Sequence, residues 1–187
     1  MTVPAGRKVQ ACVVVHKDHH AKVLSDIGED CVIVPRGTKS HCLVFLDKLR
    51  AGLSQRTAMP KTMISKTAED ALNAVVTFES SCCLVDAGAL AGYQALHPGA
   101  FRQLRVLSES ESFPQSVIAY RKGELSDTAV SKLKRGLLEA HRTPAGRPLM
   151  MLWNLKGFEE VPGDYPAQLE AISKSYPAPE VPVTLEK

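Results

Sequence analysis

The chain has 187 residues, of which 44% are hydrophobic and 23% are charged, and its formal net charge is +3. This composition is typical of a soluble globular protein, and the length allows one α/β domain of ordinary size or two small lobes. The basic residues form no long run and no apolar stretch approaches the roughly 20 residues that span a bilayer, which argues against a nucleic-acid-binding protein and against a transmembrane helix.

The first two thirds of the chain alternate short apolar runs with amphipathic segments. Apolar runs rich in valine, isoleucine and cysteine predict buried strands, and apolar residues spaced by three or four positions predict helices. The predicted strands cover residues 9–15, 31–34, 62–64, 82–86 and 104–107, and the predicted helices begin near Ala21, Lys39, Thr67 and Ala87. Strands that alternate with helices in this way predict an α/β fold with a mixed sheet flanked by helices.

The last third of the chain is richer in helices. After a polar link at residues 108–114, a returning strand is predicted at 116–120. Ser126 is a predicted N-cap for a long helix, and a last helix is predicted near residues 165–176. The proline-spaced residues after Pro177 predict a flexible tail.

One stretch carries the strongest signal for a binding site. A strand at 31–34 runs through a turn with Pro35 and Gly37 into an amphipathic helix, and the joint reads Gly37-Thr38-Lys39-Ser40. The first turn of a helix has unpaired N–H groups and a partial positive charge, so this joint suits a small anion. The alternative is that Thr38 or Ser40 only caps the helix.

The five cysteines do not indicate a disulfide framework, a metal site or an enzyme. They neither pair evenly nor show a C-x-x-C spacing, and the histidines before residue 21 have no ligand partner at a metal-binding spacing. Cys42 follows His41 at a helix start, but neighbours in a helix point in different directions, and His41 is expected on the exposed side. We therefore predict no enzyme activity, no metal and no cofactor.

Four stretches together resemble the second half of the periplasmic substrate-binding proteins that serve phosphate/phosphonate-type ABC transporters. The resemblance covers about residues 10–160, and each stretch stands in the family's order. They are Val13-Val14-Val15-His16-Lys17-Asp18 with Leu24-Ser25-Asp26-Ile27, then Gly37-Thr38-Lys39-Ser40, then Asp86-Ala87-Gly88-Ala89, and finally Leu104-Arg105-Val106-Leu107-Ser108-Glu109-Ser110 with Phe113-Pro114. In the second stretch the family has a Ser-Thr-Ser-Gly anion loop, so Lys39 adds a positive charge that either favours an anion or fills the pocket.

The resemblance implies a type II binding-protein fold, with two α/β lobes and a small oxyanion such as phosphate or phosphonate in the cleft. It implies ligand contacts at Gly37, Thr38, Lys39, Ser40, Asp86, Tyr93 and Ser110. In the family a carboxylate near Asp86 meets the amino group of aminophosphonates, although Asp86 could equally cap the helix that follows. An ABC transporter permease is the implied protein partner.

The expected organisation has four parts: a disordered N-terminus at 1–8, an α/β ligand-binding lobe at 9–112, a returning strand with C-terminal helices at 113–176, and the tail at 177–187. The apolar run at 13–15 is too short for a signal-peptide core. A chain complete as given is thus expected in the cytoplasm, and a fragment whose export signal lies outside it is expected in the periplasm.

Two other functions stay open from the sequence. One is a structural or interaction domain that keeps the fold without a ligand, and the other is a cysteine-dependent enzyme. A homodimer is a further conjecture, because a second copy could replace a lobe that this chain does not supply.

Overall fold

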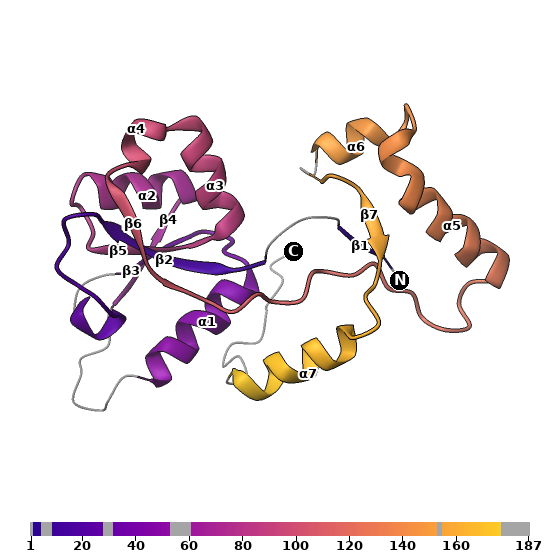
Figure 1. Ribbon diagram of the computed structural model, residues 1–187, viewed down its shortest axis with the longest axis horizontal. Helices are drawn as coiled ribbons and strands as arrows, with labels where there is room; N and C mark the ends of the chain where they lie inside the picture. Colours follow the sequence, from indigo (N-terminus) through magenta and orange to yellow (C-terminus); the bar gives the residue numbers. More distant parts are fainter. Residues whose placement is uncertain (1, 5–8, 28–31, 53–60, 153–154, 177–187) are drawn as a thin grey trace. The chain divides into compact units, whose positions relative to one another are not determined.

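The computed structural model describes residues 2–4, 9–27, 32–52, 61–152 and 155–176. It consists of two compact units, each of which is discontinuous in sequence (Figure 1). Unit 1 contains residues 1–8 and 114–170, and unit 2 contains residues 9–113 and 171–187. The chain therefore crosses from one unit to the other after residues 8, 113 and 170.

Unit 2 is built on a mixed five-stranded sheet with the strand order β4-β3-β5-β2-β6. The strands are β2 (Ala11–His16), β3 (Val32–Pro35), β4 (Thr62–Ser65), β5 (Cys82–Asp86) and β6 (Leu104–Glu109). Strand β3 is parallel to β4 and β5, whereas β2 is antiparallel to β5 and β6. The α/β class predicted from the alternating pattern is thereby confirmed.

Helices cover both faces of this sheet (Figure 1). Helix α1 (Ser40–Ala51) packs on one face, and α2 (Ala68–Val76) and α3 (Ala87–Leu96) pack on the other. Every residue of β2, β3 and β5 is buried. A strand covered on both faces must be apolar on both, which explains why these strands read as continuous apolar runs.

Smaller elements complete unit 2. The short helical segment predicted at 21–27 is the 3-10 helix η1 (Leu24–Ile27), and α4 (Pro98–Phe101) follows α3. Predicted strands at 9–15, 62–64, 82–86 and 104–107 correspond to β2, β4, β5 and β6 within two residues. Cys31, the expected first residue of β3, lies outside the described residues.

Unit 1 has a two-stranded antiparallel sheet of β1 (Thr2–Pro4) and β7 (Phe158–Glu160). Its helices are α5 (Asp127–Glu139), η2 (Ala140–Arg142), α6 (Gly146–Leu152) and the first part of α7 (Tyr165–Ser175). In the described part of this unit, Met150 and Phe158 are the buried hydrophobic residues. Unit 1 therefore has a much smaller core than unit 2.

Two local expectations differ from the structure in unit 1. The segment 1–8 was expected to be disordered, but residues 2–4 form β1, because β7 supplies a partner from far along the chain. The returning strand expected at 116–120 is reduced to a single bridge residue, Ile118. Whether each of these two segments forms a strand depends on a pairing partner elsewhere in the chain, and a short apolar run does not specify that partner. The tail at 177–187 lies outside the described residues.

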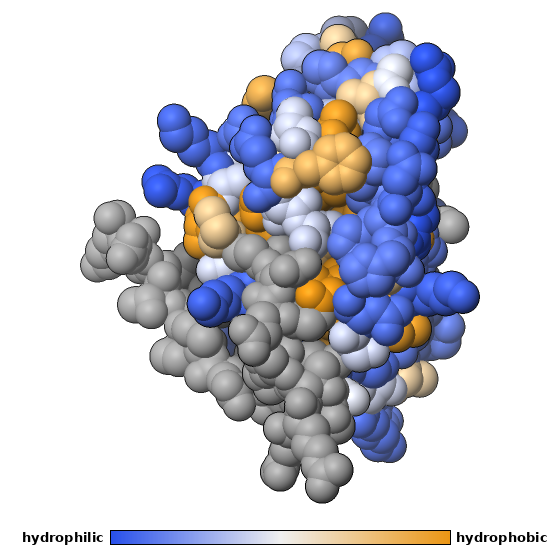
Figure 2. Space-filling model, turned by 90° about the vertical axis from the view of Figure 1, so that its left-hand side faces the viewer, coloured by the Kyte–Doolittle hydropathy of each residue, from blue (hydrophilic) through white to orange (hydrophobic). Residues whose placement is uncertain are grey.

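Exposed hydrophobic side chains occur on both units. On the face drawn in Figure 2 they form separate spots among hydrophilic groups, which is normal for a protein surface. No helix in the described ranges combines the length and the apolar character needed to cross a membrane.

Candidate functional site

Three polar side chains meet at the carboxyl ends of the neighbouring parallel strands β3 and β5. Lys39 Nζ lies 2.9 Å from Asp86 Oδ1, and His41 Nε2 lies 3.1 Å from Asp86 Oδ2. Asp86 ends β5, and Lys39 and His41 stand at the start of α1, which follows β3. This edge of an α/β sheet is where such folds usually hold ligands.

The turn between β3 and α1 depends on Gly37. Its φ of 70° lies in the left-handed region, which costs glycine little and other residues more. The Thr38 N–H and the Thr38 hydroxyl both donate to the Pro35 carbonyl, at 3.1 Å and 2.6 Å. Thr38 thus stabilises the turn that delivers Lys39 to Asp86.

Helix α1 begins without a side-chain cap. Its N-cap residue is Lys39, which makes no side-chain capping hydrogen bond, and Ser40 is the exposed first residue of the helix. The alternative that Thr38 or Ser40 caps this helix is therefore wrong, because the Thr38 hydroxyl is used by Pro35. The first N–H groups of α1 are left for water or a bound anion.

Asp86 has two roles in the structure. Its Oδ1 accepts a hydrogen bond of 3.0 Å from the Gly88 N–H, so it caps α3 as the sequence allowed. The same carboxylate, 9% exposed, pairs with Lys39 and His41. Burial acts to raise the pKa of Asp86, but the contacts with His41 and Lys39 outweigh burial and hold the pKa well below its usual range.

His41 is the residue of this site that the sequence analysis missed. Its side chain is only 10% exposed, so the expectation that it lies on the exposed side of α1 is wrong. His41 Nε2 is within ion-pair distance of Asp86, yet among the described residues it has no partner aligned for a hydrogen bond. The available signal in the sequence was the presence of Lys39 and His41 together at a predicted helix start.

Tyr93 and Ser110 lie outside this cluster, and their polar atoms are already used. Tyr93 is buried on the sheet face covered by α2 and α3, and its hydroxyl donates to Asn73 Oδ1 at 2.6 Å. Ser110 Oγ accepts from the Ala11 N–H at 2.9 Å and donates to the Glu111 carbonyl at 2.8 Å. The predicted ligand contacts of these two residues find no support in their surroundings.

The described cysteines have the properties of core residues. Cys12, Cys42, Cys82 and Cys83 are buried. Burial, followed by the charge of Asp86, raises the pKa of the Cys42 thiol to about 12, with Lys39 opposing this rise. A thiol with this pKa supplies almost no thiolate nucleophile at neutral pH. Within the described ranges, no group of three or more histidine, cysteine or acidic residues could hold a metal ion.

The fold matches solved structures over nearly the whole chain. XAC2383 from Xanthomonas citri, solved with chloride, superposes with a TM-score of 0.71 at 18% identity, covering 94% of this chain and 68% of that protein. A binding protein component of an ABC phosphonate transporter from Pseudomonas aeruginosa, PA3383, gives a TM-score of 0.61 at 16% identity, covering 92% and 59%. PhnD1 from Prochlorococcus marinus, solved with methylphosphonate, gives 0.60 at 11% identity, covering 92% and 70%.

These matches define the class of the protein: the chain has the α/β fold of type II periplasmic binding proteins. The family model for the periplasmic substrate-binding proteins of phosphonate ABC transporters matches residues 2–165, so the chain belongs to that family. No curated protein matches the chain. The family is one of substrate-binding proteins of transporters, not of enzymes, and PA3383 is likewise a binding protein component. The chain spans between 59% and 70% of the lengths of the three relatives.

Proposed function

We propose that this chain is a solute-binding protein, or part of one, that recognises a small oxyanion such as phosphate or phosphonate for ABC-type uptake. The observation that carries the proposal is the uncapped start of α1, which has the Lys39 ammonium beside it. A helix start combined with a lysine supplies backbone donors, the helix dipole and a full positive charge to one anion.

Lys39 is suited to exchange partners. Its side chain is 46% exposed, whereas Asp86 is 9% exposed, so the lysine can turn toward solvent while the carboxylate stays in place. In the ligand-free chain Asp86 neutralises Lys39. An incoming oxyanion must therefore compete with Asp86 for the Lys39 ammonium, while Asp86 keeps its contacts with His41 and the Gly88 N–H.

The same ion pair supports a second candidate, an interaction domain that has kept the fold and lost the ligand. If Lys39 and Asp86 remain paired under all conditions, the pair occupies the place of an anion and the site binds nothing. Competition between Asp86 and the anion for Lys39 distinguishes these two candidates. If the site binds an anion, removing the Lys39 charge abolishes anion binding, whereas removing the Asp86 charge strengthens it.

The test is a thermal-shift titration with phosphate, sulfate, methylphosphonate and 2-aminoethylphosphonate. A ligand that binds only the folded chain raises Tm as its concentration increases. We expect Lys39→Met to abolish the rise and Asp86→Asn to strengthen binding of phosphate or methylphosphonate by about tenfold, because the competing charge is removed. Lys61→Met is the matched control, since Lys61 is exposed and precedes the opposite end of the sheet, at the start of β4.

Two results would contradict the proposal. A flat response of the wild-type chain and of Asp86→Asn to all four anions would favour the interaction domain. A rise that Lys39→Met and Lys61→Met leave equally intact would place the anion elsewhere.

We also propose a second copy of this chain as a partner, with an ABC permease as the partner that the family implies. A shallow apolar groove on unit 1 supports a protein partner; it is lined by Ile118, Ala119, Tyr120, Val130, Leu133, Lys134 and Leu137. Leu133 and Tyr120 are 46% and 45% exposed there. Light scattering after size exclusion should show a dimer that Leu133→Asp dissociates, and a strict monomer would refute the proposed dimer.

The periplasm is the proposed location, because the family is periplasmic.

A further inference from the structure

Three aromatic rings form a continuous line that begins at the candidate site. His41, beside Asp86, lies 5.5 Å from Phe113 between ring centroids, and Phe113 lies 4.9 Å from Tyr176. Phe113 and Tyr176 are 8% and 7% exposed. All three residues belong to unit 2, and both contacts are close enough for direct packing.

The line ends at positions where the chain passes between units. Phe113 is the last residue before the crossing into unit 1, and its N–H donates to the Val9 carbonyl, just after another crossing. Tyr176 follows α7, the helix whose first residues belong to unit 1 and whose last residues belong to unit 2. The rings therefore connect the site to the segments that join the units.

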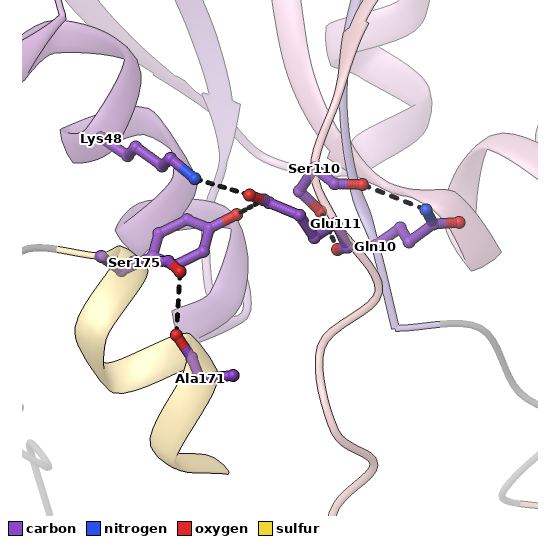
Figure 3. A network of polar contacts seen from close by, with 7 residues as sticks. Gln10, Lys48, Ser110, Glu111, Ala171 and Ser175 are labelled. Atoms are coloured by element: carbon purple, nitrogen blue, oxygen red, sulfur yellow. Dashed lines mark hydrogen bonds and ion pairs between the residues drawn. The ribbon is translucent and has the colours of Figure 1, made fainter. Parts of the chain in front are cut away.

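Tyr176 also makes polar contacts with Glu111 and Lys48. Its hydroxyl donates to the Glu111 carboxylate, and Lys48 Nζ lies 2.6 Å from Glu111 Oε1 and 4.2 Å from the centre of the Tyr176 ring. Figure 3 shows Lys48 of α1 and Glu111 pointing toward each other beside the end of α7. Ile172, one turn earlier, packs on the same core. These contacts anchor the end of α7 to unit 2.

We propose that His41 is a positioning residue that couples the occupancy of the Asp86 site to the anchoring of α7. When Lys39 leaves Asp86, the carboxylate draws the His41 side chain into an aligned hydrogen bond. The imidazole then withdraws from Phe113, and Phe113 packs less closely on Tyr176. Release of Lys39 by a ligand thus loosens the end of α7.

The ligand-free arm of the test uses hydrogen exchange at residues 172–176. Lys39→Met imitates the release of Lys39, so we expect these amides to exchange about threefold faster than in the wild type. Lys61→Met is the control and should change nothing. Phe113→Leu should interrupt the series of ring contacts from His41 to Tyr176. Adding Lys39→Met to this variant should then not increase the exchange rate at residues 172–176 any further. Phe101→Leu, in the core on the other sheet face, is the control for Phe113.

The ligand arm rests on the proposed function and uses methylphosphonate. Because coupling between two sites is reciprocal, Tyr176→Phe should tighten methylphosphonate binding, by at most the factor that the ligand adds to the exchange rate. Equal exchange in Lys39→Met and Lys61→Met would overturn the coupling, even if methylphosphonate binds. A flat response to methylphosphonate together with faster exchange in Lys39→Met would leave the coupling intact and remove the proposed function.

Discussion

At the scale of single residues, Asp86 has the largest predicted effect, because Lys39, His41 and a backbone N–H all contact its carboxylate. We expect Asp86→Asn to lower the free energy of unfolding by about 2 kcal/mol, a typical cost for a lost charged hydrogen-bond partner. Solvent around the half-exposed Lys39 keeps the loss well under that of a fully buried pair. Urea titration of both proteins at pH 6 measures it.

The effect of Asp86 should depend on pH in a defined direction. The pKa of Asp86 is lower in the folded chain than in the unfolded chain, so its contribution is complete above the unfolded value of about 4 and is lost as the pH falls below it. The difference in free energy of unfolding between the wild type and Asp86→Asn should therefore become smaller from pH 4 to pH 3. Asp47→Asn on α1 is the control, and a gap that widens in acid would refute the assignment.

At the scale of elements, the helix starts of unit 2 differ in how their N–H groups are satisfied. Thr67 Oγ1 accepts from the Asp70 N–H at 3.0 Å, and Asp70 Oδ2 accepts from the Thr67 N–H at 3.0 Å, which completes a capping box on α2. Helix α1 has no such cap. Capping of α2 thus contributes to stability, whereas no side-chain cap contributes at the start of α1.

This contrast predicts different costs for two similar substitutions. Thr67→Ala should lower the free energy of unfolding by about 1 kcal/mol, the usual value of an N-cap. Ser40→Ala should change it by less than about 0.5 kcal/mol, because Ser40 is exposed and caps nothing. Urea denaturation followed by circular dichroism measures both. Equal losses in the two variants would mean that Ser40 has a capping role after all.

At the scale of the whole molecule, the two units have very different cores. In unit 2 every residue of β2 is buried, whereas α5 in unit 1 has no buried residue among those described. Segments with few buried apolar contacts open locally at low free energy. We therefore expect the amides of α5 to exchange at least about a hundredfold faster than those of β2.

Hydrogen exchange with mass spectrometry makes this comparison on one sample. Helix α2 is the control, since it belongs to unit 2 and buries Ala71, Leu72 and Val75. Protection of α5 equal to that of α2 would contradict a weakly stabilised unit 1. Protection of α5 that rises with protein concentration would support the proposed dimer.

The sequence by itself determined the elements of unit 2 and the turn at residues 37–40 that leads into α1. Local apolar runs predicted its strands because both sheet faces are covered, and Ser126 was a predicted cap that does cap its helix, α5 of unit 1. The family also followed from local stretches whose order along the chain is preserved. These features depend on neighbouring residues, which a sequence displays directly.

Only the tertiary structure decided which of the candidate residues meet. Lys39 and Asp86 are brought together because β3 and β5 are adjacent and parallel, and strand order is not encoded in either segment alone. The same packing turns His41 toward Asp86 and Phe113, and buries Tyr93 on the other sheet face against Asn73. The pairing of β1 with β7 likewise joins residues from opposite ends of the chain. Contacts of this kind arise from long-range packing, so the candidate site became definable only after the sheet was assembled.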